Sequence, residues 1–113
     1  MEKIRHYQKL IAELLREYAT PLGSGGLGLE DQIILDFENN HFQLVTVGWD
    51  NGKFVYLPLF HFDIKPDGKI WLMVNNTDVR IAEELVNRGV PRTDIVLGFQ
   101  PEGVRPFTDY ASA

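Results

Sequence analysis

Three polar turn sequences in the middle of the chain constrain the fold more than any other feature. They are Asn39-Asn40, Asp50-Asn51-Gly52 and Lys65-Pro66-Asp67-Gly68. Asn and Gly adopt positive φ at little cost and Pro fixes φ, so such sequences favour tight reversals between strands. The segments that the turns separate are strand-like: 32–38, 41–47, 54–64 and 69–74. We therefore expect a four-stranded antiparallel sheet that runs as a meander.

Helical patterns lie on both sides of these strands. From Glu2 to Ala19, apolar residues recur at steps of three and four, which is typical of an amphipathic helix. A second run with helical spacing, residues 79–86, follows the candidate cap residues Asn75-Asn76-Thr77 and ends before Gly89. A short turn at residues 91–94 and an extended C-terminal tail complete the prediction. The fold class is therefore α+β.

Length and composition indicate one folded domain that spans residues 1–113. Hydrophobic residues make up 44% and charged residues 24% of the chain, close to average globular composition. Cysteine is absent, which excludes a disulfide framework, a thiolate metal site and a thiol nucleophile. The glycine-rich segment 23–28 follows a helix, whereas phosphate-binding loops follow a strand, so we interpret it as a linker.

The net charge of -5 argues against direct contact with nucleic acid, because such affinity comes from Lys and Arg at the phosphates. The N-terminus carries no signal-peptide pattern. The longest apolar stretch, residues 54–62, is far shorter than the roughly 20 residues that span a bilayer. The sequence therefore predicts a soluble, cytoplasmic protein without a membrane partner.

No catalytic, cofactor-binding or metal-binding motif is found in the sequence. His6, His41 and His61 are its only histidines, and none forms an i, i+4 pair or another compact ligand motif. A Ser/His/Asp triad would need Ser24 or Ser112, which lie in the linker and at the C-terminus, poor positions for rigid placement. We therefore predict no catalytic, cofactor or metal residues, and a binding protein rather than an enzyme.

Strand alternation divides the segment 54–64 into two faces. One face carries Leu57, Leu59, His61 and Asp63, and the other, more apolar face carries Tyr56, Pro58, Phe60, Phe62 and Ile64. Because His61 and Asp63 share a face, the carboxylate can orient the imidazole, either as a structural hydrogen bond or for chemistry. Pro58 cannot donate to a strand ladder, so it indicates an edge position or a bulge.

Six residues are candidates for contact with a partner. They are Trp49, His61, Asp63, Trp71, Arg105 and Phe107. The aromatic side chains either close the core or anchor an interface, since aromatic residues and Arg dominate binding hot spots. A fixed guanidinium such as that of Arg105 normally meets a carboxylate, which belongs either to this chain or to a partner.

Short motifs in the same order along nearly the whole chain resemble the XisI family, the fdxN-element excision controlling factors. These motifs are Tyr18-Ala19, Val47-Gly48-Trp49-Asp50, His61-Phe62-Asp63-Ile64, Gly68-Lys69-Ile70-Trp71, Ile81-Ala82-Glu83-Glu84-Leu85, Gly89-Val90-Pro91, Asp94-Ile95-Val96-Leu97-Gly98-Phe99, Pro101, Arg105-Pro106 and Thr108. Each piece alone is weak, whereas together they are specific. Phe54-Val55 departs from the family pattern, in which Arg-Val is usual.

The resemblance implies a small cyanobacterial accessory protein. With a companion called XisH, such a protein controls the programmed excision of a DNA element by a site-specific recombinase. The family has no catalytic residues to transfer and no established set of binding residues, so no position here inherits a role. The companion resembles restriction-type nucleases, which implies a further possibility: an antitoxin-like protein that restrains a nuclease-like partner.

Three hypotheses about function follow. The first is a non-enzymatic regulator of DNA excision that acts through an XisH-like protein partner, in agreement with the acidic charge. The second is an excision factor that binds DNA directly. The third is a small-molecule enzyme that uses His61 and Asp63. We also expect a homo-oligomer if the sheet and its two helices leave a strand edge or apolar surface uncovered.

Overall fold

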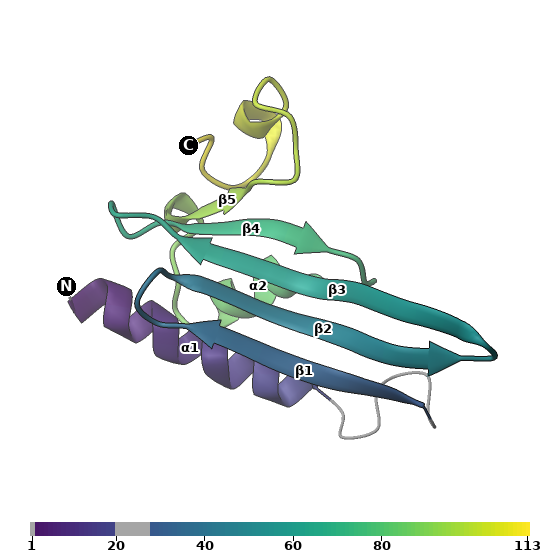
Figure 1. The fold of residues 1–113 in the computed structure, drawn as a ribbon. Coiled ribbons are helices and arrows are strands. Elements are labelled where there is room, and N and C mark those ends of the chain that lie inside the picture. The colour runs from purple at the N-terminus through teal and green to yellow at the C-terminus, as the bar shows by residue number, and fades with distance from the viewer. Residues whose placement is uncertain (1, 20–27) are drawn as a thin grey trace.

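The computed structural model describes residues 2–19 and 28–113. Its elements in chain order are α1 (Glu2–Tyr18), β1 (Leu29–Asp36), β2 (His41–Asp50), β3 (Lys53–Ile64), β4 (Ile70–Asn75), α2 (Ile81–Asn87), η1 (Arg92–Asp94), β5 (Ile95–Leu97) and η2 (Arg105–Phe107). Figure 1 shows α1 and α2 on the same face of the sheet. We call this the covered face and the opposite one the open face. The predicted linker, except for Gly28, falls outside the described residues.

The sheet has five strands in the order β1-β2-β3-β4-β5, and the first four form the expected antiparallel meander. The prediction of four strands was wrong in omitting β5, which pairs with β4 in parallel and aligns Ile70 with Ile95. A parallel neighbour needs a crossover, and α2 supplies it. Because β5 has only three residues, its sequence carries no alternation that would reveal a strand.

The C-terminal tail differs from the predicted extended segment. It turns back through η2, and Ala111 donates its backbone N–H to the Ile95 carbonyl oxygen at 2.8 Å. Ala111 also bridges Val96 in parallel, so the tail occupies the outer edge of β5. The other edge strand, β1, pairs only with β2 among the described strands.

Local chemistry explains the two hairpin turns that position the longest strands. In the first, the Asp36 carboxylate accepts backbone N–H bonds from Glu38 and Asn39, and Asn40 adopts a φ of 62°. In the second, Asn51 and Gly52 adopt φ values of 50° and 80°, the double positive φ that a two-residue hairpin requires. Both turns confirm the expectation from sequence.

The core lies between the covered face of the sheet and the two helices. Fully buried side chains from α1, β2, β3 and α2 meet there, among them Leu14, Phe42, Phe60, Phe62 and Leu85. This packing accounts for the apolar stripe of the first helix. None of the described helices combines the length and apolar character of a membrane span.

The second helix begins later than predicted. Its first residue is Ile81, and no side chain caps its N-terminus. The expected cap residues organise the preceding turn instead: Asn75 accepts the backbone N–H of Thr77, and the Thr77 hydroxyl accepts that of Val79. Asx and Ser/Thr side chains serve both purposes, so the sequence alone could not distinguish a helix cap from a turn.

A β-bulge divides β3 into two parts. The pairing with β2 shifts by one residue between Leu44, which faces Phe60, and Val45, which faces Pro58. The bulge alternative for Pro58 is therefore confirmed. Since a one-residue slip exchanges the faces of a strand, Tyr56 and Pro58 point away from the face that carries Phe60. The simple alternation over the whole segment was wrong for this reason.

Candidate functional site

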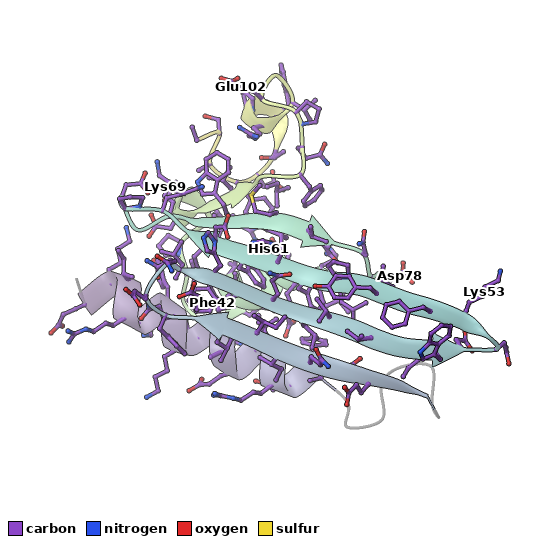
Figure 2. All side chains as sticks on the ribbon, in the orientation of Figure 1. Phe42, Lys53, His61, Lys69, Asp78 and Glu102 are labelled. Atoms are coloured by element: carbon purple, nitrogen blue, oxygen red, sulfur yellow. The ribbon has the colours of Figure 1, made fainter. Side chains whose placement is uncertain are left out.

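The β2–β3 hairpin extends beyond β4 and β5. β4 ends at Asn75 opposite Phe60, so residues 53–58 of β3 pair with β2 and with no other described strand. We call residues 45–58 the arm; Figure 1 shows it projecting past β4, and Figure 2 labels Lys53 at its tip. Pro58 thus also lies on a locally unpaired edge, as a residue without an N–H donor should.

Large aromatic side chains are exposed on the arm. Trp49, Phe54 and Tyr56 have relative exposures of 60%, 58% and 59%. The rings of Trp49 and Phe54, which face each other across the two strands, form an edge-to-face pair with centroids 5.3 Å apart. Tyr56 pairs with Val47 on the same face. Exposed apolar patches are typical of interaction sites, so these rings mark the arm as a candidate contact surface.

Trp49 was predicted either to close the core or to anchor an interface. Its exposure shows that it does not close the core. Phe54 and Tyr56, which sequence reasoning did not select, complete the surface with it. The bulge explains the omission of Tyr56, because regular alternation assigned that residue to the apolar face with Phe60.

A second group of polar side chains lies at the other end of the same strands. Asp63 Oδ1 lies 2.6 Å from His41 Nδ1 and 2.8 Å from His61 Nε2. His41 pairs with Asp63 across the strands, and His61 lies two residues before Asp63 on the same face. Figure 2 shows His61 on the open face. The predicted His61–Asp63 contact is present, and His41 joins it.

The environment of Asp63 favours its ionised form. Burial alone would raise the pKa of this carboxyl group, but hydrogen bonds from His41 and His61, together with their charge, outweigh that effect and lower the pKa below its usual value. Among the described residues, Asp63 has ion-pair contacts with these two histidines only. The arrangement therefore presents two imidazoles to one carboxylate.

Trp71 and Arg105 lie next to this group. Trp71 pairs with Asp63 in the sheet, and the guanidinium carbon of Arg105 lies 4.9 Å from the centroid of its ring. The ammonium of Lys65 lies 5.5 Å from the same ring. Such cation–π contacts fix both partners on the open face. Four of the six candidate residues, His61, Asp63, Trp71 and Arg105, are thus brought together.

Arg105 forms no ion pair with a carboxylate among the described residues of this chain, so the alternative of a partner's carboxylate stays a prediction. Within this chain its Nε donates to the Gln100 carbonyl oxygen at 3.1 Å, and its other described partner is the Trp71 ring. Phe107, two residues later, has a relative exposure of 89% and lies far along the chain from the arm. Trp49 lies on the arm and not among the four grouped residues.

The described surface also contains a hollow of about 310 Å³ near the beginning of α2. Its lining includes Asn75, Arg80, Glu83 and Tyr110. Glu83 is already engaged, because it accepts hydrogen bonds from Arg92 and from the Tyr110 hydroxyl. His61 does not line this hollow. We therefore assign no chemistry to it.

The architecture defines the class first: a small α+β domain in which two helices cover one face of a mixed five-stranded sheet. A family model described as XisI protein matches residues 1–112. The chain therefore belongs to the XisI family, as the sequence motifs indicated. Among curated proteins, none matches this chain.

Two crystal structures are similar to this chain over nearly their whole length. A XisI-like protein from Anabaena variabilis is 49% identical, with a TM-score of 0.90 over 97% of this chain and 99% of that one. The fdxN element excision controlling factor XisI from the same organism is 30% identical, with a TM-score of 0.81 over 98% and 99%. The family is thus named for the control of excision.

Proposed function

We propose that this protein is a non-enzymatic accessory factor that controls excision of a DNA element by binding a protein partner. The arm carries the proposal, because it presents three exposed rings on one hairpin. Aromatic side chains are the commonest hot spots of protein interfaces. The partner that we propose is an XisH-like companion, and the excision-factor name of the family supports the regulatory setting.

The charge of the arm supports a protein partner over DNA. The residues of the arm and the adjoining start of β1 include the carboxylates Glu30, Asp31 and Asp50 but only one cation, Lys53. Phosphate contacts need clustered Lys and Arg. The overall charge of -5 has the same sign. An aromatic surface without clustered cations suits a protein partner better than DNA.

Co-purification tests this function directly. The full chain carries an affinity tag and is co-expressed with an XisH-like protein, and the tagged protein is recovered at low salt. We expect the two proteins to elute together. Elution of this chain alone would contradict the proposal. Where they do associate, the nuclease activity of the companion with and without this chain tests whether binding restrains it.

Two alternatives have distinct signatures. Direct DNA binding would give a mobility shift that weakens steeply as salt rises, and we expect no shift even at low salt.

Self-association is the other alternative, since the outer edge of β1 pairs with no described strand and could accept a second copy. Light scattering on the isolated chain would reveal a dimer, and a dimer that excludes the companion would count against the proposal.

A further inference from the structure

His41, His61 and Asp63 place three metal-ligand atoms within 4.8 Å of one another. The atoms are His41 Nδ1, His61 Nε2 and Asp63 Oδ1. They come from two neighbouring strands and not from a flexible loop. We define these three residues as the His–Asp cluster. Sequence spacing predicted no metal site, because two of the three ligands meet only through cross-strand pairing.

The donor atoms suit a borderline transition metal. Imidazole nitrogen and carboxylate oxygen are both ligands of Zn²⁺, with bonds of about 2.0–2.1 Å and tetrahedral angles. Ligands arranged in this way lie about 3.3 Å apart. The present N···O distances of 2.6 and 2.8 Å are those of hydrogen bonds, so small rotations of the two rings would admit the ion. A bound ion would take the place of the protons in these two hydrogen bonds.

The cluster stands on paired strands and not on a loop, which favours the fixed geometry that a metal site requires. Phe42 and Phe62, which alternate with the ligands along β2 and β3, are fully buried on the covered face. Asn40 accepts the backbone N–H of Ile64 at 3.1 Å and closes the pairing at this end. The ligands therefore keep their relative positions without an ion.

Access and local charge are also suitable. The His41 side chain is 52% exposed, whereas that of Asp63 is 13% exposed, so an ion can enter past His41. Lys65 and Arg105, whose charged groups contact the neighbouring Trp71 ring, form no described ion pair with Asp63. The carboxylate is thus available to a metal ion.

We propose that the His–Asp cluster binds one divalent transition-metal ion, with Zn²⁺ as the best fit, through His41 Nδ1, His61 Nε2 and Asp63 Oδ1. Three protein ligands leave one position for water or for a donor of another molecule. The ion would link β2 to β3 at the end opposite the arm tip. This inference is independent of the proposed protein partner.

Calorimetric titration of the full, chelator-treated and dialysed chain with Zn²⁺ tests the proposal. We expect one ion per chain. His41→Asn and Asp63→Asn should each weaken binding at least tenfold, since even the loss of an outer-shell partner costs about 10–100-fold. His6→Asn is the matched control, because His6 lies on α1, and it should bind Zn²⁺ as the original chain does.

A spectroscopic readout keeps the test independent of folding. His41 is exposed, so His41→Asn should retain the thermal unfolding transition of the original chain. In two-dimensional NMR of the ¹⁵N-labelled histidine rings, Zn²⁺ should shift the signals of His41 and His61 and leave those of His6 unchanged. Three results would overturn the proposal. They are an equal loss of binding in His6→Asn and His41→Asn, no binding of Zn²⁺ at all, and ring signals of His41 and His61 that Zn²⁺ does not shift.

Discussion

The two parts of β3 on either side of the bulge have opposite surroundings. Residues 60–63 lie between β2 and β4, Ile64 pairs with β4, and the inward side chains Phe60, Phe62 and Ile64 are buried beneath the helices. Residues 53–58 pair with β2 alone, and Phe54 and Tyr56 are exposed. The same kind of residue thus serves the core in one part and the surface in the other.

This difference separates stability from recognition within one strand. Rings in the covered part are enclosed by other side chains and should dominate the free energy of unfolding. Rings on the arm should contribute little to folding and much to binding. The predictions below test that separation, from the largest expected effect to the smallest.

Phe62→Ala should lower the free energy of unfolding most. The Phe62 ring is fully buried, and truncation of such a ring costs about 3–5 kcal/mol through lost burial and the cavity left behind. Urea denaturation measures the change. Phe54→Ala is the matched control on the arm and should cost less than about 1.5 kcal/mol. Equal losses would show that the two parts of β3 do not differ.

Gly48→Ala should be the next most damaging change. Gly48 has a φ of 144°, and a Cβ there would lie 1.9 Å from the carbonyl oxygen of Gly28. A strained backbone of this kind costs about 1–3 kcal/mol, and here the base of the arm would also have to move. Gly103→Ala, which would meet no atom within 4 Å, is the control. This account would be contradicted if both variants had the same thermal unfolding midpoint.

Trp49→Ala should have a small effect on stability. Its ring contacts Phe54 at the surface, and an edge-to-face pair contributes about 0.5–1.5 kcal/mol. We expect the urea midpoint to fall only slightly and the slope of the transition to stay the same. A loss as large as that of Phe62→Ala would mean that the arm is part of the core.

Low pH should weaken the contact between α2 and the C-terminal tail on the covered side. Hydrogen bonds from Arg92 and then Tyr110 lower the pKa of Glu83 from 4.5 to about 2. The stabilisation by this carboxylate is therefore complete above pH 4.5 and disappears as the pH falls to about 2. Glu83→Gln should lack this contribution, so its difference from the original chain should shrink over that interval. A constant difference in unfolding free energy would exclude the assignment.

Much of the fold could be predicted because its signals are local. The amphipathic stripe of the first helix and the Asn51-Gly52 turn each act within a few residues, and both were identified correctly. β5 could not be predicted, since three residues become a strand only when β4 lies beside them. Its formation depends on tertiary contact and not on local propensity.

The sites depend on the bulge, which is why sequence reasoning found only part of them. Counted back from the Asn51-Gly52 turn without the bulge, His41 would face Phe62 and not Asp63. The one-residue shift brings it opposite Asp63 instead. Pro58 was the available signal, because a residue without an N–H donor indicated either a bulge or an edge. The sequence did not show in which direction the register would move.

The affinity of the XisH-like companion for an arm variant tests the central claim most directly. Trp49→Ala, Phe54→Ala and Tyr56→Ala are combined in one chain, and binding is measured by calorimetry beside Phe107→Ala, an exposed ring outside the arm. We predict at least tenfold weaker binding for the arm variant, about 1.4 kcal/mol, and unchanged binding for Phe107→Ala. The account would be contradicted if the folded arm variant bound the companion as tightly as the original chain does. It would also be contradicted if both variants lost the same amount of affinity.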